Sequence, residues 1–129
     1  MADVNRGKRP LSPFMIGPYY RPQLNSITSI LTRITGISLA LGAVLVVWWF
    51  LAASTSPEYF EFADRVMTSW LGSLVMIGSA WALWCHALAG LRHLFWDQGI
   101  GMEMASADRL SWAVIIGSVV LTLLTIVMV

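Results

Sequence analysis

The sequence has little charge and almost no cysteine. Only 12% of its 129 residues are Asp, Glu, Lys or Arg, and the formal net charge is +1. A balance this close to neutral argues against a nucleic-acid partner. The single cysteine, Cys85, excludes an internal disulfide and a metal site built from cysteines. We therefore expect Cys85 to be a small, buried apolar side chain.

Two further features are missing. The first 25 residues contain no continuous apolar core, so we expect no cleavable signal peptide there. The chain also has no internal repeat, which argues against a transporter built from inverted halves.

Apolar residues are abundant. They make up 57% of the chain, and the mean hydropathy is +0.71. Three apolar runs are each long enough to cross a hydrocarbon layer of roughly 30 Å, which takes about 20 helical residues. We therefore predict an all-α membrane protein, a single domain over residues 1–129, with transmembrane helices over about 27–53, 67–93 and 109–129.

The segments between these runs are polar. Residues 1–26 contain four prolines and predict an extended basic arm that ends at Asn25 or Ser26 as a helix N-cap. Residues 54–66 and 94–108 are predicted as loops. Lys and Arg favour the cytoplasmic side, and here they gather in the arm and near the second loop. We therefore expect the N-terminus inside and the C-terminus outside.

The stretch from His86 to Gly99 concentrates the chemistry. On a helix, His86, Gly90, His93 and Asp97 share one face. Small residues beside a histidine let a flat ligand approach, and imidazole is the commonest protein ligand to metals, so His86 predicts an axial heme ligand. The alternative is a histidine that only bonds to a neighbouring helix. An ionisable side chain within a membrane span is costly and favours the functional interpretation.

A six-coordinate heme needs a second axial ligand. His93 lies on the same side of the same helix and so cannot supply it, because axial ligands approach from opposite faces. We expect another chain to supply it, the alternative being a five-coordinate site. At the cytoplasmic edge, Arg33, Arg92 and His93 are candidates to contact heme propionates.

The first helix carries a second polar set. Ser29 and Arg33, with Gly36, share a face near the cytoplasmic boundary. A hydroxyl and a guanidinium form a donor pair suited to a carboxylate or to the carbonyl of a lipophilic ligand. The alternative is that Arg33 extends to lipid phosphate.

These motifs resemble those of the cytochrome b subunits of succinate dehydrogenase. The resemblance covers nearly the whole chain. It rests on the spacing from His86 to Gly99, on Ser29-Ile-x-x-Arg33-x-Thr35-Gly36, and on the opening Arg9-Pro10-Leu11-Ser12-Pro13. The family usually has histidine where this chain has Thr32, and threonine cannot carry a charge. The spacing from Arg9 to Ser29 is also slightly longer than expected.

The resemblance implies a heme-binding helical bundle in a bacterial inner membrane, formed with a second anchor subunit. It implies heme b, ligated by His86 and by a histidine of that partner, and a ubiquinone site lined by Ser29 and Arg33. Arg33 would also lie near a propionate, Arg92 and His93 at the heme edge, and Asp97 where protons are supplied. A flavoprotein and an iron–sulfur subunit would complete the complex. This chain would then have no succinate-oxidising activity of its own.

Two alternatives remain open. One is the anchor of a fumarate reductase, which would use menaquinone. The other is a structural membrane subunit whose polar faces only hold helices together.

Overall fold

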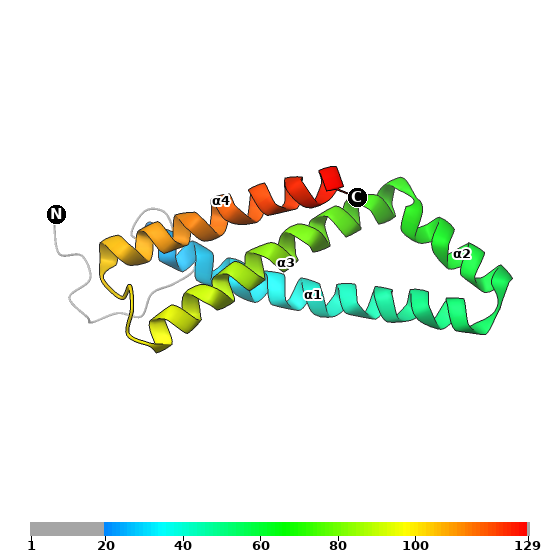
Figure 1. The fold of residues 1–129 in the computed structure, drawn as a ribbon, viewed down its shortest axis with the longest axis horizontal. Helices are drawn as coiled ribbons and strands as arrows, with labels where there is room; N and C mark the ends of the chain where they lie inside the picture. Colours follow the sequence, from blue (N-terminus) through cyan, green and yellow to red (C-terminus); the bar gives the residue numbers. More distant parts are fainter. Residues whose placement is uncertain (1–19, 129) are drawn as a thin grey trace.

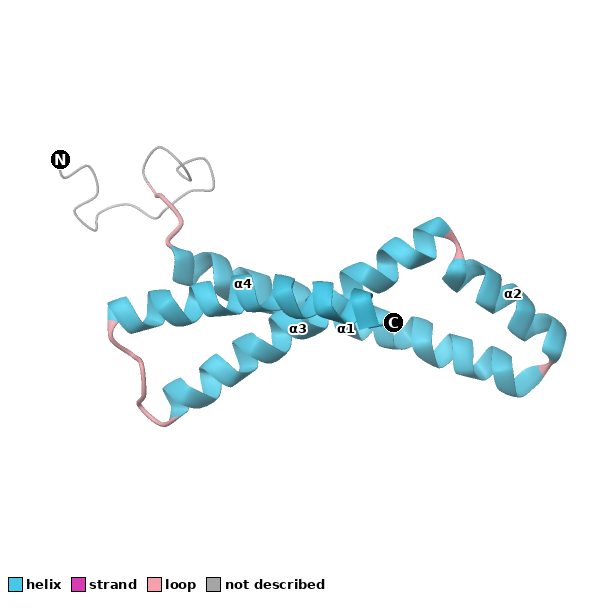
Figure 2. Cartoon of the chain, turned by 45° about the horizontal axis from the view of Figure 1, so that its top comes forward, coloured by secondary structure: helices cyan, strands magenta, loops and turns pink. Residues whose placement is uncertain are grey.

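Three long helices and one short helix make up residues 20–128, which the computed structural model describes. They are α1 (Leu24–Thr55), α2 (Pro57–Thr68), α3 (Trp70–Asp97) and α4 (Met104–Met128). Helix α3 crosses α1, and α4 packs beside them over the N-terminal half of α1 (Figures 1 and 2). The three long helices are each long and apolar enough to span a membrane. This confirms the all-α prediction with three spans.

The long helices extend further into polar sequence than predicted. Helix α1 begins three residues before the predicted start, α3 continues to Asp97, and α4 already begins at Met104. The length of an apolar run predicts only the part of a helix that lies in the membrane. The helix itself can continue into the polar flanks, because its backbone hydrogen bonds do not depend on apolar side chains. The predicted cap was wrong, since Gln23 occupies the N-cap position without a side-chain bond. Residues 1–19 of the predicted arm lie outside the described residues.

The loop predicted over residues 54–66 is wrong, because most of it forms α2. Ser56 caps this helix by accepting a hydrogen bond from the backbone N–H of Tyr59 at 3.2 Å, and Pro57 opens it. Acidic Glu58 in the first turn and basic Arg65 in the last complement the helix dipole. The polar composition of this segment suggested a loop, although its sequence contains the capping and charged residues typical of helix ends.

Aromatic side chains fix α2 against the end of α1. The indole N–H of Trp48 donates to the Tyr59 hydroxyl at 2.8 Å, and that of Trp49 donates to Asp64 at 3.3 Å. Trp49 also meets Phe60 edge to face. Both tryptophans thus bury ring surface while satisfying their N–H groups, as expected at a membrane boundary.

Glycines shape the two ends of α3. A Cβ atom on Gly72 would overlap the carbonyl oxygen of Met67, so the sharp turn from α2 admits only glycine. At the other end Gly99 has φ 73° and Gly101 has φ 75°. The amide of Ile100 bonds back to Phe95 at 3.0 Å, which closes α3 in a Schellman arrangement.

The contact between α3 and α4 uses small side chains. Ala82, Cys85 and Ala89 of α3 are buried, as are Val114 and Ser118 of α4. Small residues let helix backbones approach closely in lipid, where packing rather than water exclusion drives association. Cys85 is 1% exposed, which confirms it as a buried side chain.

Candidate functional site

His86 lies against the N-terminal half of α1. Its Nδ1 atom is 3.0 Å from the backbone carbonyl oxygen of Thr32 and 3.4 Å from the Thr35 hydroxyl. Because a carbonyl can only accept, Nδ1 carries the proton and donates it. Helices α1 and α3 are therefore in direct contact at this histidine.

This bond has a chemical consequence for the other ring nitrogen. With the proton on Nδ1, the imidazole is the tautomer whose Nε2 lone pair is available to a metal. Ligating histidines usually donate their second nitrogen to a carbonyl or carboxylate in this way. The bond to a neighbouring helix that the alternative interpretation required is thus present, and it is compatible with ligation through Nε2.

Two glycines lie near His86, Gly36 on α1 and Gly90 on α3. A Cβ on Gly36 would lie 3.0 Å from the Cε1 atom of His86, so glycine lets the ring sit against α1. A Cβ on Gly90, one turn along α3, would meet no atom within 4 Å among the described residues. A groove of about 380 Å³ also opens between α1 and α3, and Thr35, Ser79 and Ala82 are among its lining residues.

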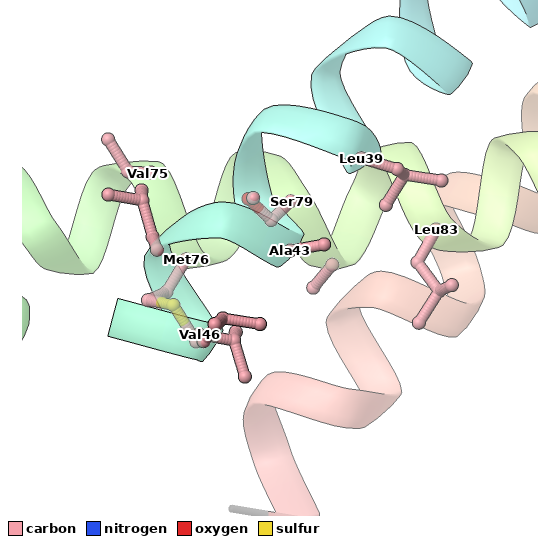
Figure 3. A pocket seen from close by; sticks show the side chains of 11 residues that line it. Leu39, Ala43, Val46, Val75, Met76, Ser79 and Leu83 are labelled. Carbon is pink, nitrogen blue, oxygen red and sulfur yellow. The ribbon is translucent and has the colours of Figure 1, made fainter. Parts of the chain in front are cut away.

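A larger groove lies between the same helices, further from the N-terminus of α1. It has a volume of about 540 Å³. Its lining side chains are apolar apart from Ser79, and Figure 3 shows Leu39, Val46, Met76 and Leu83 among them. It contains no charged side chain, so it suits only apolar contacts.

Ser29 and Arg33 lie on α1 beside the His86 contact. Arg33 directly follows Thr32, whose carbonyl binds His86, and its side chain is exposed. Ser29, one turn earlier, is half-buried. The structure therefore brings the two sets of residues predicted from the sequence to neighbouring positions. An exposed guanidinium and a hydroxyl next to His86 could both donate to an oxygen-bearing ligand.

Arg92 occupies a different environment from Arg33. It is 2% exposed and points between α1 and α4. Its Nη1 atom donates to the hydroxyls of Thr28 at 2.7 Å and Ser111 at 2.9 Å, and its guanidinium lies 4.5 Å from the Trp96 ring centroid. The sequence placed Arg92 at a heme edge, whereas the structure encloses it in protein.

His93 and Asp97 are exposed near the end of α3. His93 meets Trp96 edge to face, with ring centroids 5.3 Å apart. The indole of Trp96 donates to the carbonyl of Gly101 at 3.2 Å, which ties this end of α3 to the following loop. Both titratable groups are thus accessible at the end of the bundle where α1 begins.

Sequence reasoning missed several polar residues of this region. Thr35 contacts His86, and Asn25 donates to Asp108 at 2.8 Å while accepting from Ser111 at 2.6 Å. Each is a common residue type at a helix end or in a helix, so its type alone carries no signal. The Thr32 position does matter, but through its carbonyl, which any residue has.

Comparisons with known proteins show what this chain resembles. The model of the succinate dehydrogenase/fumarate reductase transmembrane subunit family matches residues 5–125. The chain is 58% identical over 127 residues to the succinate dehydrogenase cytochrome b556 subunit of Paracoccus denitrificans, covering 98% of this chain and 96% of the relative. It is 34% identical to the b556 subunit of Rickettsia conorii, covering 91% and 90%. It is 35% identical to the b560 subunit of Marchantia polymorpha, covering 75% and 73%.

Proposed function

The chain belongs to the succinate dehydrogenase/fumarate reductase transmembrane subunit family, and we propose that it is the membrane-anchoring cytochrome b subunit of a succinate:quinone oxidoreductase. It is a helical membrane subunit of an oxidoreductase complex. Its partners would be a flavoprotein, an iron–sulfur subunit and a second membrane anchor. The relatives named cytochrome b556 support heme as the cofactor.

The bond from His86 Nδ1 to the Thr32 carbonyl carries the heme proposal. It leaves the Nε2 lone pair available to a metal, and the residues one turn before and after His86 on α3, Ala82 and Gly90, carry no bulky side chain. His86 would be one axial ligand of heme b, and a histidine of the second anchor would be the other. No group of three or more His, Cys, Asp or Glu side chains gathers for a metal within residues 20–128. The porphyrin itself supplies four ligands to the iron, so the protein needs to supply only axial ligands. A single histidine from this chain, His86, fits that requirement.

The bound heme would supply one-electron chemistry. Residues of this chain would supply the geometry around it. Thr32 holds the imidazole tautomer through its carbonyl, and the absence of a side chain at Gly36 permits the close approach of the ring. Arg33, next to this contact and exposed, would balance the negative charge of a propionate.

Ser29 and Arg33 would also bind ubiquinone. Reducing a quinone takes two electrons and two protons, so the site needs donors at a carbonyl oxygen and access to protons. The Ser29 hydroxyl and the Arg33 guanidinium would hold and polarise the carbonyl. His93 and Asp97, exposed at the same end of the bundle, would exchange protons with the aqueous phase.

The proposed membrane is the bacterial inner membrane. The N-terminus and the α3–α4 loop would face the cytoplasm because seven of the eight basic residues lie on that side of the three spans and only Arg65 lies on the other. The C-terminus would then face the periplasm.

The test is a reduced-minus-oxidised spectrum of the complex purified in mild detergent. The complex should show a b-type band that His86→Gln abolishes and His93→Gln retains. A flavin-containing chain and an iron–sulfur chain should co-purify with it.

Three outcomes would favour another interpretation. Retention of the band in His86→Gln would refute ligation by this residue. A complex reducing menaquinone but not ubiquinone would identify a fumarate reductase anchor instead. A purely structural subunit would lower complex yield in Arg33→Ala without lowering quinone reductase activity per assembled complex.

A further inference from the structure

A polar cluster ties three helices together where α1 begins. Its members are Asn25 and Thr28 of α1, Arg92 of α3, and Asp108 and Ser111 of α4. Thr28, Arg92 and Ser111 are each at most 2% exposed. The cluster is therefore part of the interior of the bundle and separate from the exposed Arg33.

Four side chains of the cluster form a series of hydrogen bonds that runs in one direction. Arg92 donates to Ser111 at 2.9 Å, Ser111 donates to Asn25 at 2.6 Å, and Asn25 donates to Asp108 at 2.8 Å. The positive charge lies at one end of this series and the negative charge at the other. Each intervening dipole is oriented to favour both charges, so Asp108 acts as an indirect counter-ion for Arg92.

The cluster is costly if its only purpose is packing. Burying a guanidinium is unfavourable unless close ion pairing offsets the loss of water, and here the direct partners are two hydroxyls and the ring of Trp96. The buried Nε atom of Arg92 has no hydrogen-bond partner in the described part of the chain. An apolar side chain would fill this position with less penalty. Buried polar groups can instead specify one arrangement of helices, because their bonds form only in a single register.

The cluster holds the first turns of α1, which include Ser29, through hydrogen bonds of Asn25 and Thr28. Asn25 and Thr28 are three residues apart and so share the face held by α3 and α4. Ser29 directly follows Thr28, and Arg33 lies one turn further along the same helix. The rotation of α1 that the cluster sets is therefore also the rotation of the two proposed quinone donors.

We propose that Arg92 and Asp108, acting through Ser111, Asn25 and Thr28, are positioning residues that hold the start of α1 in the orientation Ser29 and Arg33 need to bind quinone. The proposal rests on the quinone site proposed above. Hydrogen bonds weaken steeply with misalignment, so a small rotation of α1 would reduce binding without removing either donor.

The sharpest test compares two buried serines of α4. Ser111 belongs to the cluster, whereas Ser118 is equally buried, lies outside the cluster and donates to the carbonyl of Ile115 in its own helix. Ser111→Ala and Ser118→Ala remove the same atom from the same helix. In the purified four-subunit complex, Ser111→Ala should raise the KM for a short-chain ubiquinone by at least about threefold, while Ser118→Ala should leave it within about twofold.

The heme band separates positioning from general damage. His86 is held by Thr32 and Thr35, one to two turns beyond the cluster along α1, so Ser111→Ala should retain the b-type spectrum. Arg92→Lys keeps a donor and should restore part of the affinity that Arg92→Met loses. Asp108→Asn should raise KM in the same direction as Ser111→Ala, because it removes the counter-ion. Assembled Ser111→Ala and Asp108→Asn complexes with unchanged KM would overturn the proposal.

A second measurement applies where Arg92 variants do not assemble or where the complex proves inactive with quinones. Ser111→Ala should accelerate amide hydrogen exchange across residues 24–33 relative to Ser118→Ala, because the cluster no longer holds that end of α1. Equal exchange in both variants would refute the positioning role. A complex without quinone reductase activity would refute the proposed function, and exchange would still decide whether the cluster holds α1.

Discussion

Gly36 and His86 are in contact across the α1–α3 interface. A Cβ on Gly36 would lie 3.0 Å from Cε1 of the imidazole, and the same ring donates to the carbonyl of Thr32 on the preceding turn. The histidine therefore fits only because α1 presents a bare backbone surface there. The contact with Gly36 depends on the absence of a side chain there. The bond to Thr32 uses the backbone carbonyl, which every residue has.

The first prediction concerns this contact. Gly36→Ala should push the imidazole away from α1 and weaken its bond to Thr32. Overpacking by one methyl group typically costs about 1–3 kcal/mol, so heme affinity should fall roughly tenfold or more. The measurement is heme content per purified complex, together with the b-type spectrum. Gly117→Ala is the matched control, because its Cβ would also lie 3.0 Å from a side-chain atom, the Cδ1 of Leu88, but at the α3–α4 contact and not at His86. Full heme content in Gly36→Ala would contradict the fit inferred here.

Arg33 supports a second prediction. Arg33→Leu should lower kcat/KM for ubiquinone by about 10- to 100-fold, the loss expected for one charge-assisted hydrogen bond to the substrate carbonyl. Arg33→Lys should recover part of this, since lysine retains the charge but not the planar donor pair. Arg65→Leu on α2 is the control, as an exposed arginine at the opposite end of the bundle. Equal activity of the two leucine variants would exclude Arg33 from the quinone site.

Helix α2 supports a third prediction. Ser56→Ala removes the N-cap acceptor for the Tyr59 amide and should destabilise α2 by about 1 kcal/mol. The readout is amide exchange of residues 57–68 in the purified complex. Ser54→Ala should have little effect on these amides, because the Ser54 hydroxyl only donates back to Leu51 within α1. Unchanged exchange in Ser56→Ala would show that packing against Trp48 and Trp49 alone maintains the helix.

The same helix should respond to acid. The pKa of Glu58 is lowered, first by a hydrogen bond from its own backbone amide and then by the Ser56 hydroxyl. A carboxylate with a lowered folded-state pKa contributes stability above its unfolded pKa and loses it as the pH falls through the folded value. Amide exchange of α2 should therefore accelerate on acidification, and Glu58→Gln should reduce this dependence. Glu61→Gln, on the same helix, is the control, and equal pH profiles for the two variants would contradict the role of Glu58.

Helix α2 also shows where sequence reasoning failed. The run from Ser56 to Arg65 contains an N-cap serine, a proline at the first position, an early acid and a late base. These residues are typical of helix ends, but the segment is too short and too polar to be recognised as a long apolar run, which is how the other helices were predicted. Its face toward α1 is set by Tyr59 and Asp64 meeting two tryptophans, a contact between segments that no local pattern reports.

The polar residues of α3 illustrate the same division. Helical periodicity placed His86, His93 and Asp97 on one face, and it placed Arg92 elsewhere on the same helix. Periodicity did not tell which face meets α1, which meets α4 and which stays open. The sequence made Arg92 a candidate for a heme propionate because it lies near the cytoplasmic end of its helix, and in the structure hydroxyls from two other helices enclose it.

The amino-acid sequence alone determined that three helices span a membrane, because only a long apolar helix satisfies its backbone within lipid. It also determined that His86 is an ionisable group within an apolar helix. Small residues, Ala82 and Gly90, lie one turn before and one turn after it. Tertiary structure decided the rest. The imidazole tautomer follows from the Thr32 carbonyl, and the burial of Arg92 follows from Thr28 and Ser111. These outcomes depend on which helix faces meet, and hydrogen-bond partners from distant parts of the chain select among faces that hydropathy leaves equivalent.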